Sequence, residues 1–278
     1  MMLIADSGSS KTSWTLIDKE AGKVQDCRTQ GINPFYQTED EIYTSLAEEF
    51  GLPFDADSAI YFYGAGCANA EKSRIVKEAL ARFFKTEKVE VQSDLLAAAR
   101  SLLGPEDGIA AILGTGSNSC YYDGEKIVDN LPPLGYILGD EGSGAVLGRK
   151  LLGDILKKQV PETICRDFFD TYNTGVAEIL DKVYRQAFPN RYLSGYTRFI
   201  AEHIREEYMD NLVKNSFVEF FKRNISYYPK AKEMPVNFCG SVAWIFQSQL
   251  RLAASDTDYL PGIIRMEPME GLITFHSK

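Results

Sequence analysis

Two short loops rich in glycine, serine and threonine each follow an apolar run typical of a β-strand. They span residues 6–12 (Asp-Ser-Gly-Ser-Ser-Lys-Thr) and 113–118 (Leu-Gly-Thr-Gly-Ser-Asn). Glycine lets the main chain approach a ligand closely, while exposed N–H groups and small hydroxyls donate hydrogen bonds to phosphate oxygens. The pair of loops therefore predicts two half-sites for the phosphates of one nucleotide.

The first loop lies between two strand-like runs, so it is expected at the tip of a β-hairpin. The G-x-x-x-x-G-K-[ST] pattern of a Walker P-loop is absent. Asp6 ends the first strand, where a carboxylate would repel a polyphosphate unless a divalent cation lies between them. The pattern thus indicates Mg²⁺ near Asp6, although an aspartate and serines that only cap their own turn are an equal alternative.

Composition excludes several classes of function. The chain has 278 residues, 45% of them hydrophobic, and a net charge of -9. Its lysines and arginines form no cluster, which argues against nucleic acid as a partner. No apolar stretch approaches the roughly 20 residues that span a bilayer, and the N-terminus lacks a signal-peptide pattern. We expect a cytoplasmic protein without a membrane partner, whose five scattered cysteines are reduced thiols.

The order of apolar runs indicates an internal duplication. The pattern predicts strands over 3–6, 13–18 and 23–29, a turn over 18–22, a helix over 40–50, a strand over 59–64, a helix over 72–84, a strand over 88–92 and a helix over 94–103. A second set of strands, over 108–113, 119–122 and 125–128, repeats the first with a glycine loop at its first bend. Mostly helical sequence over 143–225 precedes a strand at 236–239 and a helix near Trp244. We expect two domains, 1–106 and 107–278.

Four further positions are candidates for chemistry. Asp94 stands where a strand meets an apolar helix, as either a catalytic base or an ordinary helix cap. Asn33 precedes a proline that holds it out of helical conformation, so its amide can offer a donor and an acceptor. Asp140 lies between glycines before a helix, and Gly240 lies between a strand and a helix. Each of these residues could instead serve only as a helix cap or in a tight turn, without binding a ligand.

Taken in order, these motifs resemble the N-acetylglucosamine kinase branch of the BadF/BadG/BcrA/BcrD ATPase family, in the actin, hexokinase and Hsp70 superfamily. The resemblance spans residues 4 to 243 and implies an α/β fold of two duplicated ribonuclease H-like, actin-like ATPase domains with an interdomain nucleotide cleft. It implies an ATP-dependent kinase that phosphorylates N-acetylglucosamine or a related amino sugar, with the 6-hydroxyl as the expected acceptor. A carboxylate can orient such a hydroxyl and accept its proton.

The resemblance also implies roles for individual residues. Asp94 is the expected catalytic base, which the helix N-terminus would keep ionised, and Asp6 is expected near Mg²⁺. The residues expected to bind ATP are Ser9, Ser10, Lys11, Thr12, Gly114, Thr115, Gly116, Ser117, Gly240 and Ser241. Those expected to bind the sugar are Asn33, Asp94, Gly139 and Asp140.

Alternatives remain at the level of the substrate. Glucosamine, glucose or N-acetylmuramic acid would suit the same motifs, because most of them serve the nucleotide. An ATPase that acts as a conformational switch on a protein partner belongs to another class, but the Asn33 and Asp140 segments count against it. The resemblance favours a homodimer, and the sequence leaves open on which domain the segment from Pro268 packs.

Overall fold

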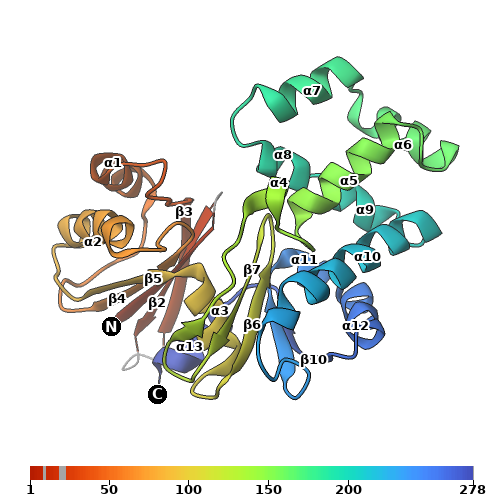
Figure 1. The fold of residues 1–278 in the computed structure, drawn as a ribbon. Helices are drawn as coiled ribbons and strands as arrows, with labels where there is room; N and C mark the ends of the chain where they lie inside the picture. Colours follow the sequence, from red (N-terminus) through yellow and green to blue (C-terminus); the bar gives the residue numbers. More distant parts are fainter. Residues whose placement is uncertain (9–10, 19–22, 278) are drawn as a thin grey trace. The chain divides into compact units, whose positions relative to one another are not determined.

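The computed structural model describes residues 1–8, 11–18 and 23–277. The chain forms two compact units, which Figure 1 shows in colours that follow the sequence: Met1–Gly104 with Pro268–Lys278, and Pro105–Glu267. The observed division lies two residues from the expected boundary at 106. The range predicted for the second domain, 107–278, differs at its end, since the segment from Pro268 packs with the first unit.

The first unit contains a five-stranded sheet in the order β3-β2-β1-β4-β5. Its strands are β1 (Met2–Ser7), β2 (Lys11–Asp18), β3 (Lys23–Gln30), β4 (Ala59–Gly64) and β5 (Val89–Ser93). β1, β2 and β3 pair antiparallel, whereas β4 and β5 run parallel to β1. The predicted turn at 18–22 includes residues 19–22, which lie outside the described residues.

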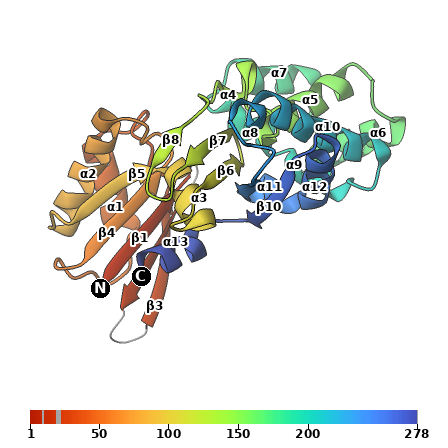
Figure 2. The same cartoon turned by 60° about the horizontal axis from the view of Figure 1, so that its bottom comes forward.

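Helices cover both faces of this sheet, as Figure 2 shows. They are α1 (Glu39–Glu49), α2 (Ala70–Phe84), α3 (Asp94–Leu103) and α13 (Met269–His276). Leu3 and Ala5 pack with α1 and α2, while Met2 and Ile4 pack with Ala97 of α3 and with α13. Because successive strand residues point to opposite faces, a strand buried on both faces is apolar throughout.

The second unit repeats the strand order of the first, as β8-β7-β6-β9-β10. Its strands are β6 (Gly108–Leu113), β7 (Ser117–Tyr122), β8 (Ile127–Asp129), β9 (Pro235–Cys239) and β10 (Leu260–Arg265). Again the first three pair antiparallel and the last two run parallel to the first. The predicted α/β fold with two duplicated domains is therefore confirmed.

Helices dominate the remainder of the second unit. They are α4 (Gly135–Leu138), α5 (Gly144–Leu156), α6 (Glu162–Tyr172), α7 (Val176–Tyr184), α8 (Pro189–Ser194), α9 (Thr197–Glu202), α10 (Glu207–Arg223), the 3₁₀ turn η1 (Ile225–Tyr227), α11 (Ser241–Ile245) and α12 (Gln247–Asp256). One hydrophobic core joins β6, α5, α10 and α12. The mostly helical character predicted for 143–225 is confirmed.

Strand β10 was not predicted, because its sequence contains Pro261 and Gly262. Proline cannot donate to a ladder and is tolerated at a sheet edge or at a bulge. β10 is the edge strand, and its pairing with β9 shifts register between Pro261 and Ile264.

Among the described residues, no helix is long and apolar enough to cross a membrane.

Candidate functional site

The register of the first sheet brings three chain segments to one edge. β1, β4 and β5 are parallel, with Ser7 paired to Gly64 and Gly64 paired to Ser93. These residues end their strands, so the loop after β1, the loop after β4 and the start of α3 follow from neighbouring positions. The carboxyl ends of parallel strands are the usual place for ligands in α/β folds.

The first glycine loop joins β1 to β2 as a hairpin, as predicted. Asp6 is half-buried near the end of β1, and Lys11 is exposed at the start of β2. The Gly8 N–H donates to the Lys11 carbonyl at 3.0 Å, which closes the turn. Ser9 and Ser10, both expected to bind ATP, lie outside the described residues.

Two buried hydroxyls brace this hairpin. Thr12 Oγ1 lies 2.8 Å from Ser7 Oγ and donates to the Gln30 carbonyl at 3.0 Å. Ser7 Oγ in turn accepts the Ile32 N–H at 2.9 Å. The Thr12 hydroxyl, expected to bind ATP, is thus already engaged inside the first unit. Ser7, which was not predicted as a site residue, ties the first glycine loop to the segment that carries Asn33.

Asn33 begins a tight turn rather than an open loop. Its Oδ1 accepts the Phe35 N–H at 3.0 Å, and its own N–H donates to Gln37 Oε1 at 2.7 Å. Within the described chain, no hydrogen bond engages the side-chain NH₂ of Asn33. We expected this amide to offer both a donor and an acceptor; with Oδ1 held by Phe35, the NH₂ is the group left for a ligand.

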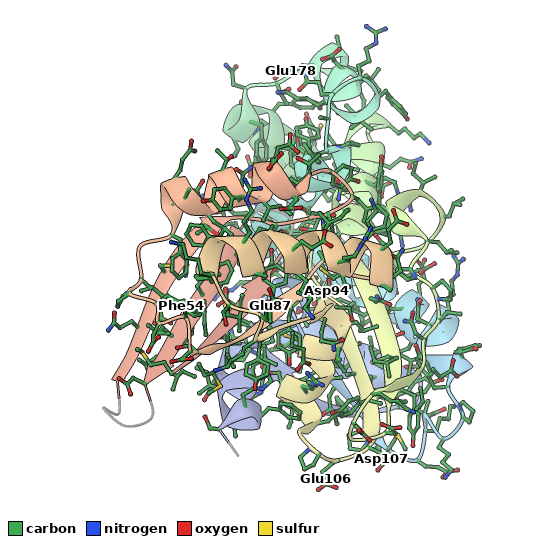
Figure 3. The ribbon with its side chains drawn as sticks, turned by 90° about the vertical axis from the view of Figure 1, so that its left-hand side faces the viewer. Phe54, Glu87, Asp94, Glu106, Asp107 and Glu178 are labelled. Carbon is green, nitrogen blue, oxygen red and sulfur yellow. The ribbon has the colours of Figure 1, made fainter. Side chains whose placement is uncertain are left out.

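Asp94 is the first residue of α3, after the N-cap Ser93, whose Oγ accepts the Leu96 N–H at 3.2 Å. The capping role that was an alternative for Asp94 therefore belongs to Ser93. Asp94 Oδ1 accepts the Leu95 N–H at 2.9 Å, and this bond lowers the pKa of Asp94. Burial outweighs that bond and raises the pKa of Asp94 above its ordinary value. Figure 3 labels Asp94 at the beginning of this helix.

The second glycine loop joins β6 to β7 and is held by helix α5. The Gly144 and Ala145 N–H groups, at the start of α5, donate to the carbonyls of Gly114 and Thr115 at 2.8 and 3.1 Å. The first N–H groups of a helix have no partner within it, so these bonds satisfy both elements. The loop is therefore held by a helix that lies thirty residues further along the chain, as the bond between Gly144 and Gly114 shows.

Asp140 lies against this same loop. A Cβ built on Gly116 would be 3.0 Å from Asp140 Oδ2. Burial and the charge of Glu141 raise the pKa of Asp140, against the opposing effect of the backbone N–H groups of Ser117 and Gly135. Asp140 also has a φ of 54°, a conformation that costs a non-glycine residue free energy. The structure thus brings a residue expected to bind sugar onto a loop expected to bind phosphate.

The segments flanking Asp140 have different environments. Gly139 ends the short helix α4, and its N–H donates to the Gly135 carbonyl at 2.8 Å. Glu141 is buried and pairs with Arg223 at 2.8 Å, and it also accepts a bond from Asn224. Glu141 is therefore committed to packing against α10 and η1, which leaves Asp140 as the carboxylate beside the loop.

Gly240 and Ser241 also lie close to the second glycine loop. Gly240 has a φ of 125°, and a Cβ built on it would overlap the Leu113 carbonyl at the end of β6. Only glycine permits this approach, so the segment expected to bind adenosine abuts the strand that leads into the loop. Trp244 is 44% exposed on α11, whereas Trp14 is fully buried in the first unit.

Metal binding was expected at Asp6. Among residues 1–8, 11–18 and 23–277, no group of three or more His, Cys, Asp or Glu side chains could hold an ion. Mg²⁺ is commonly bound through one or two carboxylates together with substrate phosphates and water. A single carboxylate beside the first glycine loop would fit an ion that is bound together with a nucleotide.

Comparison with solved structures finds one relative with high sequence identity and others that share the fold. A protein from Porphyromonas gingivalis, described as a "putative N-acetylglucosamine kinase", is 46% identical, with 99% of this chain and 98% of that chain covered and a TM-score of 0.95. A protein of the same description from Chromobacterium violaceum is 16% identical, with 99% of both chains covered and a TM-score of 0.74. The AMPPNP complex of MreB 5 from Spiroplasma citri has a TM-score of 0.60 at 11% identity, covering 99% and 96%.

The last two similarities show the fold alone, whereas the first extends to the sequence. No protein-family model and no curated protein matches the chain. The 46% identity over nearly all of both chains, on a duplicated actin-like fold, shows that the chain belongs to the N-acetylglucosamine kinase branch of the BadF/BadG/BcrA/BcrD ATPase family, within the actin, hexokinase and Hsp70 superfamily.

Proposed function

We propose that the protein is an ATP-dependent kinase that phosphorylates N-acetylglucosamine or a related amino sugar at its 6-hydroxyl. The description of the 46% identical relative supports this proposal. The observation that carries it is the register of the first sheet, in which Ser7, Gly64 and Ser93 are neighbours. A glycine loop that can hold phosphate and a half-buried carboxylate at neighbouring strand ends would together serve phosphoryl transfer to a hydroxyl.

Asp94 is the proposed catalytic base. The acceptor hydroxyl is neutral, so a carboxylate that orients it and takes its proton during transfer promotes attack on the terminal phosphorus of ATP. Burial raises the pKa of Asp94, which makes its carboxylate a better proton acceptor than that of an exposed aspartate. Sugar and protein together would exclude water, which protects ATP from hydrolysis.

The proposed nucleotide site uses both glycine loops and the segment before α11. Lys11 and the small residues of the loops would neutralise and orient the phosphates, and Gly240 with Ser241 would lie against the adenosine. Asp6 would hold Mg²⁺ together with the phosphates, and the ion would neutralise charge that develops on them. The full proposed set is Asp6, Ser9, Ser10, Lys11, Thr12, Gly114, Thr115, Gly116, Ser117, Gly240 and Ser241.

Sugar recognition is proposed for Asn33, Gly139 and Asp140, together with Asp94. The NH₂ group of Asn33 would donate to a sugar oxygen, whereas the carboxylate of Asp140 would accept from sugar hydroxyls. Because Asp140 contacts the second glycine loop, occupation of the sugar site would also steady the phosphate site. We further propose that the kinase acts in the cytoplasm as a homodimer, without a nucleic acid or membrane partner.

The test is ADP release from Mg²⁺-ATP, alone and with N-acetylglucosamine, glucosamine, glucose or N-acetylmuramic acid. We expect stimulation by one amino sugar, its loss by about 10²- to 10⁴-fold in Asp94→Asn, and NMR of the product showing phosphate on carbon 6. Asp170→Asn, at an exposed aspartate of α6, is the matched control and should retain activity. ADP release that no sugar stimulates would favour a nucleotide switch, and stimulation by glucose alone would change the acceptor.

A further inference from the structure

The loop after β4 was not predicted to have a role, yet it lies beside several residues of the proposed site in the first unit. The Ala65 N–H donates to the Ser7 carbonyl at 2.9 Å, which joins this loop to the first glycine loop. Cys67 is buried, and its thiol has a pKa raised to about 12, chiefly by burial and also by the charge of Asp94. Between them, Gly66 lies against Asn33.

Gly66 meets two requirements that exclude other residues. Its φ is 84°, in the region that favours glycine. A Cβ built on it would overlap Asn33 Oδ1 and would lie 3.0 Å from Asn33 Cγ and 3.1 Å from Phe35 Cδ2. The Asn33 side chain therefore rests directly on the Gly66 backbone, in space that any side chain at residue 66 would take.

Lys72 of α2 also supports the Asn33 turn. Lys72 of α2 donates from Nζ to the Pro34 carbonyl at 3.1 Å, and the same ammonium lies 5.1 Å from the centre of the Phe35 ring. Because Lys72 holds the turn from α2, the turn cannot simply retreat from an added Cβ. A side chain at residue 66 would instead have to move the Asn33 amide.

We propose that Gly66 is a positioning residue for sugar binding: its missing side chain sets where the Asn33 amide lies and leaves the NH₂ group directed to the sugar. This inference rests on the proposed function, in which Asn33 donates to a sugar oxygen. In this proposal Gly66 acts through Asn33, the side chain that a Cβ at residue 66 would overlap. We therefore expect its substitution to change mainly the affinity for sugar, because Asp94 and the second glycine loop are held by hydrogen bonds that do not involve Gly66.

The test compares Gly66→Ala with Gly104→Ala, using the sugar that stimulates the wild type most. Gly104 also has a positive φ, of 60°, and a Cβ built there meets nothing within 4 Å, so its substitution removes a positive-φ glycine without creating the contact. Loss of one hydrogen bond corresponds to a roughly three- to tenfold rise in the KM for sugar. We expect that rise in Gly66→Ala alone, with kcat and the KM for ATP close to those of Gly104→Ala.

A double-mutant cycle tests whether Gly66 affects sugar binding through Asn33. In an Asn33→Ala background the overlapping oxygen is gone, so Gly66→Ala should raise the KM for sugar no further. Should Gly66→Ala alone fail to fold, Asn33→Ala/Gly66→Ala is expected to fold, as judged by circular dichroism and thermal unfolding. A double variant that also fails to fold overturns the proposal.

The failures of the two hypotheses differ. If wild-type protein releases ADP in response to a sugar but Gly66→Ala and Gly104→Ala have equal KM values for it, the role of Gly66 is overturned and the kinase stands. Additive effects of Asn33→Ala and Gly66→Ala would also overturn that role. If no sugar stimulates the wild type, the kinase and the positioning role fall together.

Discussion

Two partly buried carboxylates, Asp94 and Asp140, are the main candidates for chemistry in this chain. Each lies where a loop or strand meets a helix, and each has a pKa raised mainly by burial although backbone N–H groups oppose the shift. Burying a charged group costs free energy. Buried charged groups with shifted pKa values therefore cluster at functional sites. These residues are therefore the places where stability and function should conflict.

Replacing Asp94 with asparagine should show this conflict as a pH-dependent gain in stability. Since the folded-state pKa of Asp94 is raised, its contribution to stability is fully present below the unfolded-state pKa of about 3.9 and is lost as pH rises through the folded-state pKa. Asparagine carries no charge and keeps an oxygen for the Leu95 N–H. Urea unfolding should find Asp94→Asn more stable than wild type at neutral pH, with the difference vanishing in acid.

The contact of Asp140 with Gly116 gives a second prediction at the residue scale. A methyl group on Gly116 would press on Asp140 Oδ2 at 3.0 Å, whereas one on Gly114 in the same loop meets nothing within 4 Å. If Asp140 binds sugar, Gly116→Ala should raise the KM for sugar by about three- to tenfold more than Gly114→Ala does. Steady-state kinetics of the two variants would contradict the contact's importance if their KM values agreed.

At the scale of elements, close backbone packing decides which glycines are required. In helix α5, a Cβ on Gly148 would overlap the Leu193 carbonyl of α8, while a Cβ on Gly153 meets nothing within 4 Å. The two glycines lie in one helix, so their helix propensities are alike. Their substitutions by alanine should nevertheless have opposite effects on stability.

We expect Gly153→Ala to raise the free energy of unfolding by about 0.5–1 kcal/mol, because alanine is the better helix former. Gly148→Ala should lower it by about 1–3 kcal/mol, because α8 must move away from α5. Urea unfolding followed by circular dichroism would measure both changes. Equal changes in the two variants would mean that α5 and α8 are not packed backbone to backbone.

At the scale of the whole molecule, the path of the chain matters most. The first unit is built from both ends of the sequence, since α13 packs with α3 and β1 after the chain has completed the second unit. Leu272 of α13 is fully buried among Ile4, Tyr63 and Ala97. Stability of the first unit therefore depends on residues that follow the second unit in the sequence.

Leu272→Ala should destabilise the first unit by about 2–5 kcal/mol, the range for emptying a buried leucine site. A Trp244→Phe background leaves Trp14, which is buried in the first unit, as the single tryptophan, so its fluorescence follows that unit's unfolding. Thr274→Ala, on the exposed side of α13, is the control and should change stability by less than about 0.5 kcal/mol. Unchanged Trp14 unfolding in Leu272→Ala would contradict the packing of α13.

The sequence by itself determined the features that depend on near neighbours along the chain. Apolar runs and glycine loops predicted every strand of the two sheets except β10, the hairpins at the two loops and the duplication that the strand orders confirm. The Ser-Asp pair at a strand end placed Asp94 at the first turn of α3. These predictions succeed because hairpins and helix starts are set by the conformational preferences of a few consecutive residues.

Only the tertiary structure decided which distant groups meet. It buried the Thr12 hydroxyl against Gln30, set Gly66 beneath Asn33, placed Asp140 on the second glycine loop, and returned α13 to the first unit. Strand β10 escaped prediction because its pairing, rather than its composition, makes it a strand. Such contacts follow from sheet register and helix packing between segments far apart in sequence, which no local pattern of residues specifies.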